Sequence, residues 1–520
     1  MILDFLRRFG RSRRANVAVT FALTLLPISL MVGMGIDVAN ATRLKLQLQD
    51  ATDAAALGLA RQAPSIADSA ISSTANNLVA SGYGATAFTV TSATIDRNTI
   101  TATLDTKVDA PVFFSSLIGV SSIPVTAHAT AKGMLLEIAV VLDTSGSMSN
   151  SAGTGGSKIS ALRSAGAALL DAMFGTQATS QRVSMSVVPF AASVRVVPAG
   201  STPQPWMDTA GQSSIAGEDF DNPAKTRWSL FSQMHNVSWG GCVITRPAPY
   251  DVDDTSPSSG NPDTLFVPWF APDEPDPAGG GWGWGWGWGG GGSTYANHYL
   301  DDQGGSCGGS TSGWTDAQLQ ARTCKYNNAT PSAGKGPNYL CDSNAITPLT
   351  NSKAPLSSAI SSLQANGNTN ILEGLMWGWR TLSPSAPFTE GKSYTSPNNR
   401  KVVILMTDGQ NYFGGTNNFN MSSYFSYGYA AKGRVGAATS NNTTLTSMLD
   451  AKTLTACTNA KAAGILIYTI AFGSGASVSQ GLLKSCATDP KYFFAPQNSS
   501  DLVPVFKQIA QSINSLRIAD

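Results

Sequence analysis

Three oxygen-bearing side chains stand at alternate positions directly after an apolar run over residues 136–142. Asp143, Ser145 and Ser147 supply one carboxylate and two hydroxyls. Hard divalent cations prefer oxygen ligands, and Mg²⁺ takes few protein groups beside water or a partner's oxygen. The spacing of two lets the three side chains turn toward one point, so it predicts a divalent-metal site. The alternative is a turn whose Asp and Ser only cap the next helix.

Two later segments end in side chains of the same kind. Thr369 precedes a predicted helix at 371–382, and Asp408 follows an apolar run at 401–407 that is typical of a buried strand. Alternating strands and helices predict an α/β fold, a doubly wound and mostly parallel sheet flanked by helices. Ligands of such sheets bind at the carboxyl ends of the strands, so these loops should lie together.

The remaining elements of this domain follow from hydrophobic periodicity. We expect strands at 183–190, 193–197 (an antiparallel edge strand), 465–472 and 492–495, and helices at 158–174, 357–363, 444–463, 479–487 and 501–515. The Asn- and Tyr-rich stretch 411–442 should be a loop that borders the site.

The three polar segments together resemble the metal-ion-dependent adhesion site (MIDAS) of von Willebrand factor A (vWA) domains. They read D-x-S-x-S, G-x-T-x-x-x-x-G-L and T-D-G, in the family's chain order. The resemblance implies a vWA-like fold and one bound Mg²⁺, with Mn²⁺ or Ca²⁺ as alternatives. It also implies an open coordination position, which an acidic side chain of a partner protein would fill. The implied ligands are Asp143, Ser145, Ser147, Thr369 and Asp408.

The N-terminus predicts a membrane anchor. A basic leader precedes an apolar run over residues 17–38, whose 22 residues would span roughly 33 Å as a helix, enough for a ~30 Å hydrocarbon core. A cleaved signal peptide is the alternative, but no small-x-small site follows the run. Because arginines stay in the cytoplasm, the rest of the chain should face outward. The leader's arginines are Arg7, Arg8, Arg11, Arg13 and Arg14.

This region also resembles a specific family. The segments V-A-V-T-F-A-L at 17–23, G-I-D-V at 35–38 and L-Q-D-A-T-D-A-A-A-L at 48–57 are similar to the N-terminal region of TadE and TadG, the Tad/Flp pilus-assembly proteins. Ala15 and Thr20 replace the Gly and Glu of the processing site in prepilin-like members, which favours a permanent anchor. The resemblance implies a single-pass protein of the bacterial inner membrane, with a periplasmic or extracytoplasmic C-terminal part and other Tad proteins as partners.

We expect four regions. Residues 1–62 hold the leader, the transmembrane helix and its extension; residues 63–132 form a small β-rich α+β unit, with short strands that include 112–114. The vWA-like domain comprises 133–198 and 349–520, interrupted by a Gly/Pro/Trp-rich insertion at 199–348. The helix at 43–62 should pack either on its own domain or on partner pilus-assembly subunits. His128, in a strand, is interpreted as a structural residue.

All six cysteines follow residue 240. Four lie in the insertion, Cys242, Cys307, Cys324 and Cys341, where an oxidising compartment would give two disulfides in one of three pairings. Zinc is disfavoured because no C-x₂₋₄-C pair occurs. Cys457 and Cys486, in helices flanking one strand, should bond to each other. The G-W repeat at 281–288 is either a low-complexity loop or a tip that contacts a glycan or a surface.

Composition narrows the function classes. Charged residues make up 13% of 520 residues and the net charge is +1. The sequence shows no basic patch that would argue for nucleic-acid binding. The leading hypothesis is a membrane-anchored extracytoplasmic binding protein of Tad/Flp pilus assembly. A structural scaffold without metal-dependent binding is the alternative. A metal-dependent hydrolase would need a general base beside the ion, and none of the chain's three histidines lies in a catalytic motif, so no enzyme is expected.

Overall fold

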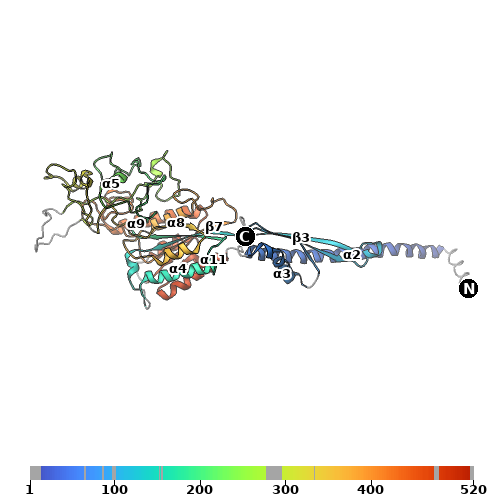
Figure 1. The fold of residues 1–520 in the computed structure, drawn as a ribbon. Coiled ribbons are helices and arrows are strands. Elements are labelled where there is room, and N and C mark those ends of the chain that lie inside the picture. Colours follow the sequence, from blue (N-terminus) through green and yellow to red (C-terminus); the bar gives the residue numbers. More distant parts are fainter. Residues whose placement is uncertain are drawn as a thin grey trace. The chain divides into compact units, whose positions relative to one another are not determined.

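The computed structural model describes residues 13–63, 66–84, 87–96, 101–151, 153, 156–276, 295–332, 334–473 and 479–515. The chain divides into two compact units, Met1–Met134 and Leu135–Asp520 (Figure 1). Each unit buries hydrophobic clusters of its own.

The first unit combines a long helix with a small antiparallel sheet. Helix α2 (Arg13–Gln62) is followed by the 3₁₀ turn η1 (Asp68–Ala70) and helix α3 (Ile71–Tyr83). Strands β1 (Thr89–Asp96), β2 (Thr101–Pro111) and β3 (Ser122–Lys132) then pair in the order β1-β2-β3. Alternate residues of β2 are buried, as expected of a sheet with one covered face.

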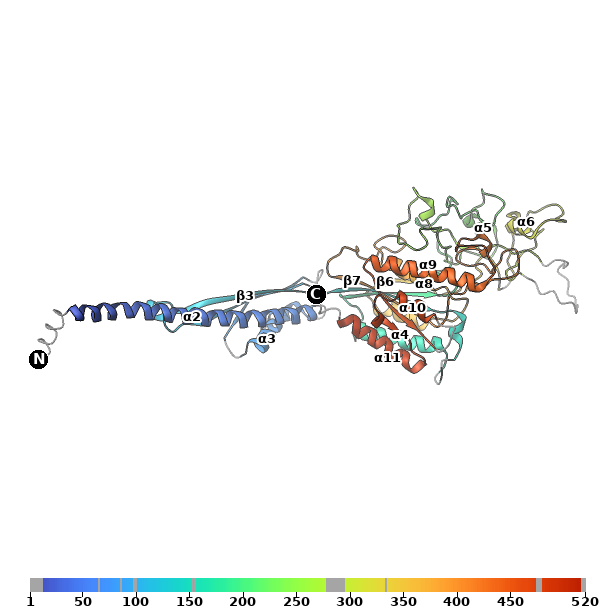
Figure 2. The same ribbon diagram turned by 180° about the vertical axis from the view of Figure 1, so that it is seen from behind.

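The C-terminal half of α2 covers that face (Figure 2). Its small and aliphatic side chains recur at helical spacing and pack against β2 and β3, so the helix at 43–62 packs on its own domain. The buried helix residues include Leu48, Ala51, Ala55 and Leu59. The N-terminal half is different: within Val19–Gln62 a stretch is long and apolar enough to cross a membrane by length and composition.

The predicted strand at 112–114 is wrong. Strand β2 ends at Pro111, and the chain turns into a 3₁₀ segment, η2 (Ser115–Ile118). The N–H groups of Phe113 and Phe114 donate to the carboxylate of Asp37 on α2 instead of to a neighbouring strand. A long-range acceptor therefore overrides the local β propensity of Val and Phe.

The second unit is built on a six-stranded, mostly parallel sheet of order β6-β5-β4-β7-β8-β9. Only β6 is antiparallel to its neighbour. The expected α/β class is thus confirmed. The strands are β4 (Leu135–Asp143), β5 (Val183–Phe190), β6 (Thr347–Thr350), β7 (Asn399–Thr407), β8 (Leu466–Ala471) and β9 (Phe493–Phe494).

Helices cover both faces of this sheet (Figures 1 and 2). Along β4, Ala139 and Val141 point into one core cluster and Ile138, Val140 and Leu142 into the other. One face is covered by α8 (Ile371–Thr381), α9 (Asn442–Ala462) and α10 (Gln480–Cys486), the other by α4 (Lys158–Phe174), α7 (Lys353–Ser361) and α11 (Ser499–Ser515). Short 3₁₀ segments are η3 (Gly146–Ser149), η6 (Ala430–Lys432) and η7 (Pro490–Tyr492).

The edge strand was predicted in the wrong place. Residues 193–197 form no strand, and β6 pairs with β5 instead. Arg195 explains the difference, because its side chain donates to the carbonyl groups of Ser343 and Cys341 and draws this segment toward the insertion. The proline in β6 is tolerated because an edge strand needs few ladder bonds.

The insertion is ordered around buried aromatic side chains such as Trp239 and Trp269 rather than around long elements. It contains α5 (Arg227–Gln233), α6 (Asp316–Ala321), η4 (Pro262–Thr264) and η5 (Cys324–Tyr326). The G-W repeat at 281–288 lies outside the described residues.

All six cysteines are paired. The predicted Cys457–Cys486 bond is confirmed, and it joins α9 to α10. Of the three pairings left open in the insertion, the structure has Cys242–Cys341 and Cys307–Cys324.

Candidate metal centre

Two neighbouring parallel strands end together at one edge of the sheet. Leu142 of β4 is level with Met406 of β7. Asp143 is the last residue of β4, and Asp408 directly follows β7. Parallel strands present their carboxyl ends at the same edge, so both carboxylates come to one place although they are 265 positions apart in the sequence.

The first loop is held in shape by Asp143. Its Oδ1 accepts a hydrogen bond from the N–H of Ser145 (2.7 Å), and its Oδ2 accepts one from the hydroxyl of Thr407 (2.5 Å). The hydroxyls of Ser145 and Ser147 lie 3.1 Å apart, and Ser147 Oγ donates to Asp408 Oδ1 (2.6 Å). The three residues of the alternate pattern and Asp408 thus form one connected network.

Thr369 enters from a second loop that is fastened to the first. The N–H of Gly146 donates to the carbonyl of Gly367 (2.8 Å). A Cβ atom placed on Gly409 would lie 3.2 Å from Thr369 Oγ1 and 3.9 Å from Ser147 Oγ. Both hydroxyls therefore border the small space beside Gly409, which any larger residue there would fill.

The loop after Asp408 supports this arrangement. The N–H of Tyr412 donates to the carbonyl of Thr369 (2.9 Å), and Asn411 Oδ1 accepts from the N–H of Ile371, at the start of α8 (2.8 Å). Asn411 is fully buried. The expected loop at 411–442 therefore borders the site and positions Thr369.

Two participating residues were not predicted. Lys158, the first residue of α4, places its Nζ 2.7 Å from Asp408 Oδ2, with only 17% of its side chain exposed. Thr407 holds Asp143, as described above. The sequence could have marked Thr407 as a site residue, because it is the first residue of the T-D-G segment. For Lys158 the sequence indicated only the start of a helix.

The site concentrates negative charge. Asp143 is fully buried, and burial raises its pKa to about 6, with the nearby Asp408 carboxylate adding to the rise. Lys158 contributes one positive charge against two carboxylates. A divalent cation at this position would offset both.

The donor set fits a hard divalent ion. Two carboxylates and three hydroxyls converge, and each carboxylate oxygen of Asp143 that accepts one hydrogen bond keeps a second lone pair. In the described part of the chain no group of three or more His, Cys, Asp or Glu side chains could hold a metal ion. Carboxylate and hydroxyl oxygens suit Mg²⁺ better than zinc.

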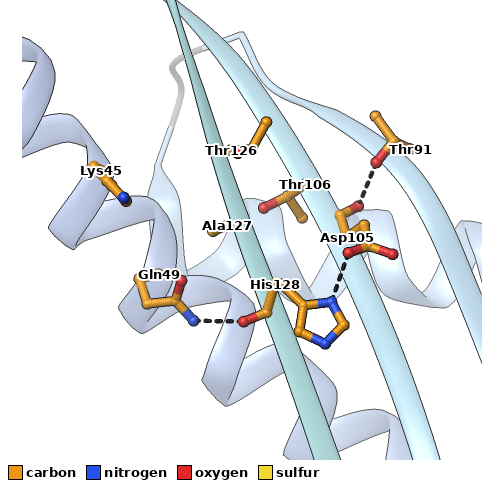
Figure 3. A pocket seen from close by; sticks show the side chains of 8 residues that line it. All are labelled: Lys45, Gln49, Thr91, Asp105, Thr106, Thr126, Ala127 and His128. Atoms are coloured by element: carbon orange, nitrogen blue, oxygen red, sulfur yellow. Dashed lines mark hydrogen bonds and ion pairs between the residues drawn. The ribbon is translucent and has the colours of Figure 1, made fainter.

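A second polar site lies in the first unit (Figure 3). The cavity, about 420 Å³, is bordered by α2 and all three strands and includes Lys45, Thr91 and Thr106. His128 Nδ1 lies 2.7 Å from Asp105 Oδ1, and the His128 carbonyl accepts from Gln49 (2.8 Å). His128 therefore pairs across two strands, consistent with its interpretation as a structural residue.

Comparison with known proteins gives a family for the N-terminal region. Residues 15–71 match the Tad family of Flp pilus-assembly, TadE/G-like proteins. No curated protein matches the sequence.

Solved structures with a fold similar to this chain include the following three. The vWF domain of the type V pili tip protein Mfa5 from Porphyromonas gingivalis is 13% identical (TM-score 0.34; 75% of this chain and 98% of that chain covered). The PilB minor pilin from Streptococcus sanguinis is 11% identical (TM-score 0.33; 83% and 78% covered). Proximal thread matrix protein 1 from the mussel byssus, with a zinc-occupied MIDAS motif, is 12% identical (TM-score 0.28; 73% and 46% covered).

Proposed function

For a chain with a TadE/G-like N-terminal region and a vWA-like second unit, we propose a membrane-anchored, extracytoplasmic binding protein of Tad/Flp pilus assembly. It binds an acidic side chain of a partner protein through a divalent metal ion. The convergence of five oxygen-bearing side chains at one edge of the sheet carries this proposal.

Each residue has a defined part in it. Ser145, Ser147 and Thr369 present hydroxyl oxygens, and Asp143 and Asp408 supply the negative charge. A Mg²⁺ ion held here supplies an electrophilic position for a carboxylate oxygen of the partner. The hydrogen bonds from Thr407 and from the Ser145 N–H keep Asp143 oriented before any ion arrives.

Two independent features support the proposed location. The apolar half of α2 has the length and composition of a membrane span, and the arginines before it favour a cytoplasmic N-terminus. All three disulfides belong to the second unit, which suits an oxidising compartment outside the cytoplasm.

The test is calorimetric titration of the full-length protein in detergent with Mg²⁺ and with Mn²⁺. Saturable binding at one site should disappear in Asp143→Ala. The matched control is Asp171→Ala, which removes an exposed carboxylate from α4 of the same unit and should bind as the parent does. Equal binding by parent and Asp143→Ala would refute the proposed site.

One observation favours a second candidate, a scaffold that binds no metal. The Lys158 ammonium already neutralises part of Asp408. If the parent protein binds neither ion, this ion pair is a structural substitute for the metal and the chain acts as an anchored scaffold. We assign no catalytic residue.

A further inference from the structure

The connection between β2 and β3 exposes an unusual number of large apolar side chains. No charged residue occurs from Ala110 to Val125. Phe113 and Leu117 are 70% and 74% exposed, and Ile118 is 58% exposed. Phe114 and Val120 are also exposed. A contiguous apolar patch of this kind on a folded unit marks a contact with a membrane or a partner.

Asp37 fastens this connection to α2. Its Oδ1 accepts from the N–H of Phe113 (3.0 Å), and its Oδ2 accepts from the N–H of Phe114 (2.9 Å). The same Oδ2 accepts from the N–H (2.7 Å) and the hydroxyl (2.8 Å) of Ser115. Asp37 is fully buried by these groups. Charge-assisted bonds to backbone N–H groups are strong, so the loop is firmly positioned.

Gly33 supports the same contact one turn earlier on α2. A Cβ atom there would lie 2.3 Å from Cγ of the Phe114 ring, so only glycine admits the ring. Gly33 and Asp37 are four residues apart and therefore share a helix face. The loop thus packs on the outer end of the apolar run at 17–38.

The part of α2 that the loop contacts also carries exposed apolar side chains. Next to Gly33 and Asp37 in the sequence, Met31, Val32 and Ile36 are exposed. The nearest charges on β2, Lys107 and Asp109, pair with each other 3.3 Å apart beyond the apolar stretch. An apolar band that ends at charged residues matches the boundary between lipid tails and water.

We propose that residues 113–120 insert into the outer leaflet of the lipid bilayer beside α2, as a second membrane contact. This rests on the proposed anchoring role of α2. It also explains the acidic residue in the apolar run: Asp37 is a clamp for the loop, and the loop's N–H groups satisfy a carboxylate that would otherwise be costly near hydrocarbon.

Photo-crosslinking in vesicles of phosphatidylethanolamine and phosphatidylglycerol tests the proposal. A benzophenone amino acid replaces one residue of the full-length protein, and mass spectrometry identifies the adduct. Three exposed leucines are compared: Leu117 in the loop, Leu26 in the apolar run, and Leu46 on the same helix about 13 Å beyond Asp37.

Lipid adducts are expected at Leu26 and Leu117 and not at Leu46. Adducts at Leu26 alone, or protein adducts at Leu117, would overturn the loop proposal and leave the anchor standing. No lipid adduct at Leu26 would refute the anchor and the loop with it. Asp37→Ala should abolish the adduct at Leu117 while keeping the one at Leu26; retention at Leu117 would refute the clamp.

Discussion

At the scale of single residues, the candidate site is a balance of charge. Asp143 and Asp408 lie at one edge of the sheet, and Lys158 pairs with Asp408. Hydroxyls fill the remaining space and add oxygen ligands without adding charge. A divalent ion bound here would replace the positive charge that Lys158 now places beside Asp408.

Lys158→Ala should tighten Mg²⁺ binding. The ammonium competes with the ion for the buried Asp408 carboxylate. Even an exposed ion pair is worth up to about 1 kcal/mol, so the affinity should rise about fivefold or more. Calorimetry measures the change. The control is Lys353→Ala on α7, which breaks an ion pair with Asp171 of α4, away from the site. It should leave the affinity unchanged. Weaker binding in Lys158→Ala would show that the lysine helps the ion.

Mg²⁺ should stabilise the protein at pH 7.5 and lose this effect near pH 5. Burial raises the folded-state pKa of Asp143 to about 6, so below that pH a proton occupies the carboxylate and opposes the metal. Without metal the sign is opposite: the native state binds more protons than the unfolded state, so stability falls as pH rises from 3.8 to about 6.

Thermal unfolding with and without Mg²⁺ at the two pH values checks this. The metal-free Asp143→Asn variant should show a smaller loss of stability across the same window. An equal Mg²⁺ effect at both pH values would contradict the role of Asp143.

At the scale of elements, the insertion is held by polar groups buried among aromatic rings. Lys325 Nζ lies 2.7 Å from Asp273 Oδ2 and 2.9 Å from Asp302 Oδ1, and all three residues are buried. Such a cluster adds little net stability but is costly to break, because a lone buried charge remains.

Lys325→Met should therefore lower the free energy of unfolding by about 3–5 kcal/mol at neutral pH. Denaturant unfolding of the full-length protein measures the loss. The control, Lys491→Met, breaks an exposed pair with Asp489 and should cost less than about 1 kcal/mol. Similar losses in both variants would show that breaking the buried cluster costs no more free energy than breaking an exposed ion pair.

At the scale of the whole molecule, covalent bridges are confined to one of two units. The cysteines of Cys242–Cys341, Cys307–Cys324 and Cys457–Cys486 all belong to the unit Leu135–Asp520. The other unit, Met1–Met134, contains no cysteine. In the described part of this unit, the buried hydrophobic clusters are built from α2, α3 and the antiparallel sheet.

Reduction should destabilise only the second unit. Each disulfide contributes roughly 2–4 kcal/mol, chiefly by restricting the unfolded chain. Calorimetry in detergent should show two transitions, of which a reducing agent lowers one. Leu104→Ala, in the core of the first unit, should lower the other and so assign it. A reductant that moves the Leu104-sensitive transition would contradict this division.

The sequence by itself determined the sheet class and the central strands, because hydrophobic periodicity is a local property. The five candidate ligands came from the resemblance of three short segments to the adhesion site of vWA domains. The Cys457–Cys486 pair was also predictable, since its helices flank one strand.

Only the tertiary structure decided which segment became the edge strand, how the insertion cysteines pair, and which partners Lys158 and Asp37 find. Each of these contacts joins segments that no shared strand, helix pair or motif places side by side. Such contacts depend on how the elements pack in space, and no local pattern of residues specifies them.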